Sequence, residues 1–403
     1  MKKLVLFGAG KIGRSFIGQL FSRSGYEVVF IDIFQAVIDE LNRRKSYNVI
    51  IKGNNEDIIK VDFVRGVLGT DKKAVAYEVA TADILAVSVG QQGLTHIIPV
   101  IAEGFKQRYS SNSTNALDII IAENLRNASE FIKSELLKYL PTDYPIEKLV
   151  GLVETSIGKM VPIMLKKDME DDILQVFAEA YNTLILDKKG FKNPVPEVNG
   201  LAPKENMKAW VDRKSFIHNL GHAVTAYMGY MYDPTFLFIY EPLAIPEIKK
   251  FVRDTMLQSA KILMAEYPNE FTLKSLTEHI DDLIQRFENK ALGDTVYRVG
   301  CDLLRKLSRE DRLMGAILMG AKHKLPYDNI LYALVCGFYF RATDEQGVML
   351  PRDREFNSDY FERGPEFVLI NCCGLITESE RDIVDKALNV NQSLRNGKFI
   401  IQS

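Results

Sequence analysis

The sequence predicts an α/β protein in which an N-terminal Rossmann-type domain, built on a parallel sheet, precedes a mainly α-helical C-terminal domain. In the first half of the chain, short apolar runs alternate with longer amphipathic ones, and a glycine-rich turn follows the first apolar run. The second half carries mostly helical periodicity. A chain of 403 residues is too long for one hydrophobic core, so we expect two domains, residues 1–195 and 196–403.

The first half contains apolar runs that are short and rich in Val, Ile and Leu, as buried strands are: Leu4–Phe7, Val28–Asp32, Ile84–Val89, Asp118–Ala122 and Leu149–Val153. Segments with the periodicity of amphipathic helices lie between them: Ile12–Ser24, Phe34–Arg44, Gln91–Gln107 and Ala128–Leu140. Strands that alternate with helices form a parallel sheet covered on both faces. Tyr47–Val64 interrupts this order with two β-rich stretches around Gly53-Asn54-Asn55, which predicts a β-hairpin.

The texture of the sequence changes at residues 191–203, where three prolines and a glycine predict a connector between the domains. Beyond the connector, helical periodicity recurs in these segments: Met207–Met228, Pro246–Glu266, Leu273–Phe287, Arg309–Ala321 and Tyr327–Phe340. The segment Thr343–Gly364 is rich in Asp, Glu, Arg, Gly and Pro. This composition predicts an exposed loop or insertion.

Composition and charge exclude several classes of partner. The hydrophobic fraction of 47% and charged fraction of 26% are typical of a soluble protein, and a net charge of -2 offers no field for nucleic acid or an anionic membrane. No apolar segment approaches the roughly 18 residues of a membrane span, and the run after Met1 is too short for an export signal. The cysteines show no C-x-x-C spacing, so we expect reduced, mostly buried thiols and a cytoplasmic protein.

The segment Gly8-Ala9-Gly10-Lys11-Ile12-Gly13 has the spacing G-x-G-x-x-G between a predicted strand and a predicted helix. In this context Gly8 makes the tight turn, Gly10 lets the backbone approach a pyrophosphate, and Gly13 packs the helix on the strand. The helix N-terminus attracts negative charge. Asp32 ends the next strand, where an acid accepts from ribose hydroxyls and repels a 2′-phosphate. The sequence therefore predicts NAD as cofactor, with a ligand-free glycine turn as the alternative.

Two further strand ends point to the same crevice. Val89 and Gly90 close one apolar run, and we expect them to touch the adenosine or nicotinamide ribose. Asn124 follows the next run at a comparable carboxyl end. Its side chain is a candidate donor to the substrate oxygen, although a turn-forming asparagine explains the residue equally well.

Lys214, Asn219 and His222 fall within an arc of about 140° on a regular α-helix, with His218 between them. Hydride transfer from an alcohol needs a base for the hydroxyl proton and donors for the developing carbonyl oxygen. Lys214 is the candidate base if burial lowers its pKa, Asn219 joins Asn124 as an oxygen-binding amide, and His222 orients the substrate. The alternative is a solvated polar helix face.

Two other classes of protein compete with this interpretation. His218 and His222 have the H-x-x-x-H spacing of a zinc site, but the zinc hydrolase motif requires Glu where this chain has Asn219, and no third ligand is indicated. We therefore predict no metal. A non-catalytic NAD-sensing protein would keep the glycine loop, but it gives no reason for the lysine, amide and imidazole together.

The pattern Lys214-x4-Asn219-x2-His222 resembles the signature of the long-chain, zinc-independent polyol dehydrogenases. The resemblance continues in order along nearly the whole chain, through Phe7–Gly18, Ser46-Tyr47, Ala122-Glu123-Asn124, Gly221–Tyr227, Arg286–Asn289, Arg298–Gly300, Leu304–Leu313 and Phe340-Arg341. It implies a monomeric enzyme that interconverts D-mannitol 1-phosphate and D-fructose 6-phosphate with NAD. It also implies that Lys214 is the general base and that Asn124 and Asn219 polarise the substrate oxygen.

The chain departs from the family pattern at Gly158-Lys159, where an aspartate-arginine pair is usual. Lys159 keeps the positive charge without the planar fork of arginine, and we expect it to bind substrate. Arg305, in a basic stretch that also holds Lys306, Arg309 and Arg312, is a candidate contact for the phosphate, with a solvated basic face as the alternative. The departures leave hexuronates and unphosphorylated polyols as alternative substrates.

Overall fold

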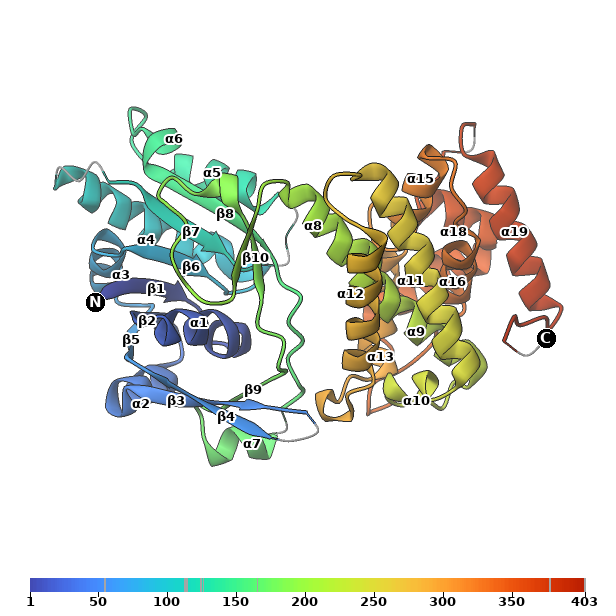
Figure 1. The fold of residues 1–403 in the computed structure, drawn as a ribbon, viewed down its shortest axis with the longest axis horizontal. Helices are drawn as coiled ribbons and strands as arrows, with labels where there is room; N and C mark the ends of the chain where they lie inside the picture. Colours follow the sequence, from blue (N-terminus) through green and yellow to red (C-terminus); the bar gives the residue numbers. More distant parts are fainter. Residues whose placement is uncertain are drawn as a thin grey trace. The chain divides into compact units, whose positions relative to one another are not determined.

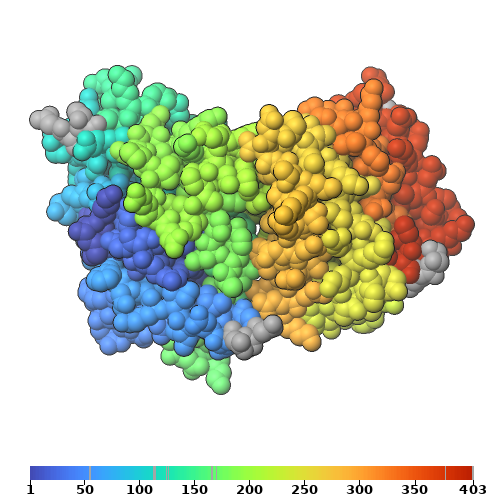
Figure 2. Space-filling model, in the orientation of Figure 1, coloured from blue at the N-terminus to red at the C-terminus, as the bar shows by residue number. Residues whose placement is uncertain are grey.

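The computed structural model of the chain describes residues 1–53, 56–111, 115–123, 125, 127–164, 166–376 and 378–401. The chain folds into two compact units, Met1–Trp210 and Val211–Ser403. Figure 1 shows strands and helices in the first unit and helices in the second, and side chains fill the spaces between the ribbons of each (Figure 2). This is the predicted fold class. The first unit extends beyond residue 195 because β11 (Leu201–Lys204) pairs with β10 (Leu184–Asp187).

An eight-stranded sheet in the order β11-β10-β8-β7-β6-β1-β2-β5 forms the framework of the first unit. Neighbouring strands are parallel except at β8–β10. The predicted strands are β1 (Lys2–Phe7), β2 (Tyr26–Asp32), β6 (Ile84–Val87), β7 (Leu117–Ile121) and β8 (Val150–Ser156). The edge strand β5 (Val64–Leu68) was not predicted. The chain order reverses between β1 and β6, which is where parallel α/β sheets bind dinucleotides.

Successive residues of β1 point to opposite faces of the sheet, and both faces are buried. Leu4 and Leu6 belong to one apolar core, and Val5 and Phe7 belong to another. This explains why the strand is a continuous apolar run rather than an alternating one. The helices of this unit are η1 (Gly13–Gly18), α1 (Gln19–Arg23), α2 (Gln35–Arg44), α3 (Lys72–Ala80), α4 (Gln91–Ser110), α5 (Ala128–Leu137), α6 (Ile146–Leu149), α7 (Lys166–Asp171) and η2 (Lys188–Gly190).

The predicted hairpin is confirmed. β3 (Ser46–Ile51) and β4 (Asp57–Asp62) pair antiparallel, with Ser46 opposite Asp62 and Ile51 opposite Asp57. The turn residues Asn54 and Asn55 lie outside the described residues. A short strand, β9 (Val176–Ala178), extends the hairpin into a second sheet by pairing with β3.

Local sequence signals set the helix ends in the second unit. Pro246 occupies the first turn of α11, and Thr272 and Ser275 form a capping box at the start of α12, so both helices have the predicted bounds. The helices before residue 350 are α8 (Met207–Arg213), η3 (Lys214–Asn219), α9 (Leu220–Tyr232), α10 (Tyr240–Leu243), α11 (Pro246–Glu266), α12 (Leu273–Phe287), η4 (Lys290–Leu292), α13 (Val296–Gly300), α14 (Leu303–Lys306), α15 (Met314–Lys322) and α16 (Asp328–Phe338).

The loop predicted for Thr343–Gly364 is wrong over its second half. Residues 351–363 are helical, and Phe356 among them is fully buried. Asp353 is also buried, and its carboxylate accepts hydrogen bonds from the backbone N–H groups of Asp302 (3.0 Å) and Leu303 (2.7 Å). The polar composition of the segment gave no indication that Phe356 would be buried or that Asp353 would cap a helix. The remaining helices are α17 (Pro351–Glu355), η5 (Phe356–Tyr360), η6 (Phe361–Arg363), α18 (Pro365–Asn371) and α19 (Arg381–Arg395).

The cysteines are free thiols, and Cys336, Cys372 and Cys373 are buried as expected, whereas Cys301 is partly exposed. Within the described ranges, no helix is both long enough and apolar enough to cross a membrane.

Candidate active site

The glycine loop begins where β1 ends, and two of its glycines are sterically required. Gly8 has φ +99°, and a Cβ there would lie 2.2 Å from the carbonyl oxygen of Ser88, at the end of the neighbouring β6. A Cβ on Gly13 would lie 2.0 Å from the carbonyl oxygen of Gly8. The loop therefore closes tightly on the two strands that flank the switch point.

Gly10 and Gly90 differ from these two because a Cβ at either would meet no atom within 4 Å. Open space beside backbone N–H groups at the start of a helix fits a pyrophosphate, which approaches the backbone closely. Lys11 is exposed and Ile12 is partly exposed in the same turn. The residues present therefore fit a bound dinucleotide.

Backbone contacts orient the carboxylate of Asp32 toward the glycine loop. One oxygen accepts from the N–H of Ala9 at 2.7 Å, and the other accepts from the N–H of Phe34 at 3.1 Å. The next side chains, Ile33 and Phe34, are 71% and 67% exposed. An anchored acid beside exposed apolar surface suits an adenosine, whose base is apolar on its faces and whose ribose offers hydroxyls. Sequence reasoning identified the acid and missed the apolar surface.

Sequence reasoning also gave no role to Glu123, the residue before Asn124. Its carboxylate accepts from the N–H groups of Val89 (2.6 Å) and Gly90 (2.9 Å), so it ties the end of one strand to the next. Burial raises the pKa of Glu123, while the two N–H donors oppose that shift. Any ribose contact by Val89 and Gly90 must therefore leave these N–H groups bonded to Glu123. Asn124 lies outside the described residues.

In the second unit, Lys214–Asn219 forms a π-helical turn rather than part of a regular α-helix. A π turn hydrogen-bonds residues five apart, so it accommodates one residue more than an α turn. Residues five apart across it therefore stand as residues four apart do on an α-helix. This narrows the arc that holds Lys214, Asn219 and His222 from about 140° to about 60°. The three side chains share one face more closely than the sequence alone predicted.

Lys214 is half-buried, and its surroundings favour the neutral form of its amine. Burial, and then the positive charge of Arg312, lower its pKa to about 8. This is the shift that the general-base hypothesis requires. Arg312 is 8% exposed, and it also contacts the π turn directly by donating from Nη1 to the carbonyl oxygen of Asn219 at 3.4 Å.

Aromatic contacts fix the ring of His222. It stacks on Phe287, with centroids 3.9 Å apart and planes at 26°, and it meets the ring of His218 edge-to-face, with centroids 5.2 Å apart. The pKa of His222 lies well below its ordinary value, first because the ring is buried and then because cations surround it: Arg298, Arg312, Lys306 and Arg286. The pKa of His218 is lowered for similar reasons. Both imidazoles are therefore neutral near pH 7.

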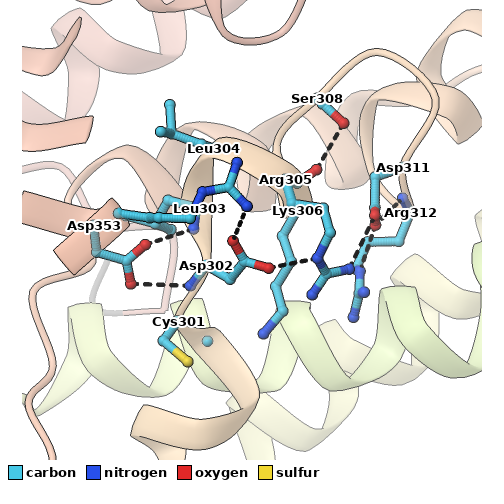
Figure 3. A network of polar contacts seen from close by, with 12 residues as sticks. Cys301, Asp302, Leu303, Leu304, Arg305, Lys306, Ser308, Asp311, Arg312 and Asp353 are labelled. Carbon is cyan, nitrogen blue, oxygen red and sulfur yellow. Dashed lines mark hydrogen bonds and ion pairs between the residues drawn. The ribbon is translucent and has the colours of Figure 1, made fainter. Parts of the chain in front are cut away.

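The basic stretch after α13 divides into paired and unpaired charges. Arg305 lies between two carboxylates: Nε donates to Asp302, and Nη1 donates to Asp311 at 3.3 Å (Figure 3). Lys306 is 5% exposed and extends away from these ion pairs, donating from Nζ to the carbonyl oxygen of Val299 at 2.6 Å. Burial, and then Arg312, lower its pKa to about 7. The geometry thus favours Lys306 over the predicted Arg305 as the cation available to a substrate.

Lys159, the other predicted substrate contact, is held within the first unit. It is 6% exposed, and Nζ donates to the carbonyl oxygens of Glu179 (3.0 Å) and Tyr181 (2.6 Å) and to Oδ1 of Asn182 (3.2 Å). An ammonium group has three donor hydrogens, and these acceptors use all of them. This geometry favours a structural role, in which the lysine ties the segment after β8 to the segment after β9.

Comparisons with known proteins agree with both halves of this description. Residues 2–200 match the mannitol dehydrogenase Rossmann domain, and residues 206–364 match the mannitol dehydrogenase C-terminal domain. A substrate-free D-sorbitol dehydrogenase has a similar fold, with a TM-score of 0.79 and 16% identity over 98% of this chain and 93% of that one. Pseudomonas fluorescens mannitol 2-dehydrogenase, solved with NAD and D-mannitol, is also similar in fold, with a TM-score of 0.73. Its sequence identity is 15%, and the match covers 98% of this chain and 92% of that one. The Rossmann match bears out the predicted NAD cofactor. The chain belongs to the mannitol dehydrogenase family of oxidoreductases.

Proposed function

We propose that the chain is a mannitol-1-phosphate 5-dehydrogenase, which interconverts D-mannitol 1-phosphate and D-fructose 6-phosphate with Lys214 as general base. The observation that carries this proposal is the amine of Lys214, which shares a helix face with Asn219 and His222 and has its pKa lowered to about 8. A base with a pKa near the working pH takes a proton readily and returns it readily.

The chain's own groups divide the work of alcohol oxidation. Lys214 takes the hydroxyl proton, Asn219 and Asn124 donate amide hydrogens to the oxygen as it becomes a carbonyl, and neutral His222 orients a neighbouring hydroxyl. Bound at the glycine loop, NAD supplies the hydride acceptor. In the reverse direction, protonated Lys214 returns the proton to the oxygen. In both directions, the hydroxyl proton therefore moves between the substrate oxygen and the amine of Lys214.

The charge around His222 supports an anionic substrate. Burial and then four cations lower the pKa of its ring, and among the residues that the structure describes, Lys306 has no carboxylate within ion-pair distance. A buried ammonium without a counter-ion is costly, and a phosphate would supply the missing charge. This favours a sugar phosphate over a neutral polyol.

Two alternative substrates remain within the family. One is a hexuronate such as tagaturonate or fructuronate, which also carries a negative charge. The other is an unphosphorylated polyol, because two similar solved structures are of enzymes named for sorbitol and mannitol. NADH oxidation measured with D-fructose 6-phosphate, fructose, tagaturonate and fructuronate separates these cases. We expect the highest kcat/KM with D-fructose 6-phosphate, and a higher value with any of the other three would overturn the substrate assignment.

Substitution of the base tests the mechanism. We expect Lys214→Ala to lower kcat for D-fructose 6-phosphate reduction by about 10²–10⁴-fold, the range for loss of a general acid or base. NADH binding, measured by fluorescence titration, should remain because the glycine loop is untouched. Lys208→Ala, at an exposed lysine on α8, is the matched control and should keep wild-type turnover. Near-normal turnover of Lys214→Ala would contradict the mechanism.

A further inference from the structure

Two buried polar atoms in the second unit face each other without hydrogen-bond partners. These are Nε2 of His222 and Oδ2 of Asp294, which lie 4.0 Å apart. The separation is about 1 Å longer than a hydrogen bond. Buried polar groups are nearly always satisfied, so two unsatisfied groups that face each other call for an explanation.

The backbone of Asp294 is fixed, so its side chain is the movable part. Its carbonyl oxygen accepts from the N–H of Ile239 at 2.9 Å, and two residues later the N–H of Val296 donates to the carbonyl oxygen of Leu237 at 2.9 Å. Asp294 is 7% exposed. Its Oδ1 accepts from Arg298, the third residue of α13, which leaves Oδ2 for another donor.

The ring of His222 is constrained in a complementary way. Stacking on Phe287 restrains rotation of the imidazole about its Cβ–Cγ bond. A shorter distance between Nε2 and Oδ2 therefore comes mainly from a movement of the Asp294 side chain.

Electrostatics decide which ring nitrogen carries the proton. Burial, and then the positive charges of Arg298 on α13, Arg312 before α15, Lys306 on α14 and Arg286 on α12, keep the ring neutral, with its pKa well below the ordinary value. A neutral imidazole has one N–H and one lone pair. A lone pair on Nε2 would face the carboxylate of Asp294 and be repelled, so the N–H belongs on Nε2.

We propose that Asp294 is the positioning residue for His222. A shift of about 1 Å lets Nε2–H donate to Oδ2, which holds the proton on Nε2 and leaves Nδ1 to accept a hydrogen bond from a substrate hydroxyl. Nothing in the sequence pointed to Asp294, because it lies 72 positions from His222. The role in substrate orientation depends on the proposed function, whereas the position of the proton does not.

The first test reads the proton directly. Full-length protein with ¹⁵N-labelled histidine gives two-bond ¹H–¹⁵N correlations for its five imidazoles, and His222→Gln identifies the signals of His222. We expect wild-type His222 to carry its proton on Nε2, both in the free protein and with NADH and D-mannitol 1-phosphate. A proton on Nδ1 in wild-type protein would overturn the proposal without any variant of Asp294.

Variants then assign the effect to Oδ2. In Asp294→Asn the proton should move toward Nδ1. Asp281→Asn is the control, because this carboxylate is paired with Arg253 and not with the histidine. In this variant the proton of His222 should stay on Nε2. Arg298→Gln removes the partner of Oδ1 and should also leave the proton on Nε2. An unchanged spectrum in Asp294→Asn, or the same displacement in Arg298→Gln, would overturn the proposal.

Kinetics supply the functional readout. We expect Asp294→Asn to lower kcat for D-fructose 6-phosphate about 10–100-fold, the usual cost of losing the group that orients a functional histidine, with a smaller change in KM. NADH affinity should be unchanged. Wild-type kcat in this variant would overturn the proposal. If wild-type protein instead fails to reduce D-fructose 6-phosphate, the proposed substrate is wrong, and the tautomer of His222 still decides the role of Asp294.

Discussion

At the scale of single residues, Lys214 shows how surroundings determine the chemistry of a side chain. An exposed lysine is protonated at neutral pH and is a poor base. In this chain, burial and Arg312 lower the pKa of Lys214 to about 8. In a large share of the protein molecules, Lys214 is therefore neutral under mildly alkaline conditions, while its protonated form remains available near pH 7.

The two reaction directions should therefore have opposite pH dependence. Oxidation of the alcohol needs neutral Lys214, so kcat/KM for D-mannitol 1-phosphate should rise as the pH increases through about 8 and then level off. Reduction needs the protonated form, so kcat/KM for D-fructose 6-phosphate should fall over the same interval. Initial rates in both directions between about pH 6 and pH 10 test this prediction. Parallel profiles would show that another group controls the reaction.

The sequence displays positive charges, but it does not show which partner neutralises each one. Lys159 and Arg305 were both candidates for substrate binding because of their charge. In the folded chain, Lys159 donates to two backbone carbonyls and an amide, and Arg305 lies between two aspartates. Those partners are close in space, and for Lys159 they come from a segment some 20 residues away. Lys306 is the neighbour of Arg305 in sequence, yet it has a different environment.

At the scale of elements, the glycine loop separates glycines that the fold requires from a glycine that the ligand requires. Gly8→Ala places a Cβ 2.2 Å from the carbonyl oxygen of Ser88 at a φ of +99°, so we expect it to destabilise the protein by about 3 kcal/mol or more. Gly10→Ala meets open space and should change the free energy of unfolding by less than about 1 kcal/mol. Its methyl group instead occupies the proposed pyrophosphate position and should weaken NADH binding about tenfold or more.

Denaturant unfolding and NADH titration of the two variants make the comparison. Gly25→Ala serves as a control for substitution at positive φ without a neighbour, because a Cβ there also meets no atom within 4 Å. Normal NADH affinity in a stable Gly10→Ala protein would contradict the assignment of this loop to the pyrophosphate.

A second element, α14, depends on an acid that lies 50 residues away in sequence. Asp353 accepts from Asp302 and Leu303 at the start of this helix, which carries Lys306. We expect Asp353→Ala to lower the free energy of unfolding by about 1–2 kcal/mol, as loss of a helix cap does, and to raise KM for D-fructose 6-phosphate. NADH affinity should not change, and Asp359→Ala, at an exposed acid of η5, should have neither effect. An unchanged KM in a destabilised Asp353→Ala protein would show that α14 does not position the substrate.

Elements with strong periodicity or caps were predicted well, and elements that depend on distant partners were not. Residues 246–266 and 273–287 have an N1 proline and a capping box, respectively, and their helices have the predicted bounds. An arginine and a glycine interrupt β5, and β9 has only three residues, so neither shows a sustained apolar run, and each is recognised as a strand only from its pairing with a strand elsewhere in the chain. The π turn at Lys214–Asn219 is another such case, because nothing in its composition distinguishes it from the α-helical residues around it.

At the scale of the whole molecule, alternation of strands and helices followed by helical segments predicted the two-part architecture, and the glycine fingerprint predicted a Rossmann-type domain. The boundary was placed too early because the connector at residues 191–203 contains prolines, yet β11 follows it and completes the sheet. Proline at an edge strand is compatible with this, since Pro203 lies in the outermost strand of the sheet. Composition alone does not reveal such a pairing.

The first unit contains its own apolar cores and the complete glycine loop, so cofactor binding and catalysis should be separable. Its buried clusters draw on residues from Leu4 to Val198. We therefore expect a fragment of residues 1–206 to unfold cooperatively and to bind NADH with an affinity of the same order as the full chain, because Gly10, Asp32 and Glu123 all lie within it. It should not reduce D-fructose 6-phosphate, because Lys214, Asn219 and His222 are absent. Circular dichroism and NADH fluorescence test these points, with Gly10→Ala in the fragment as the binding control. A folded fragment that does not bind NADH would show that residues after 206 complete the cofactor site.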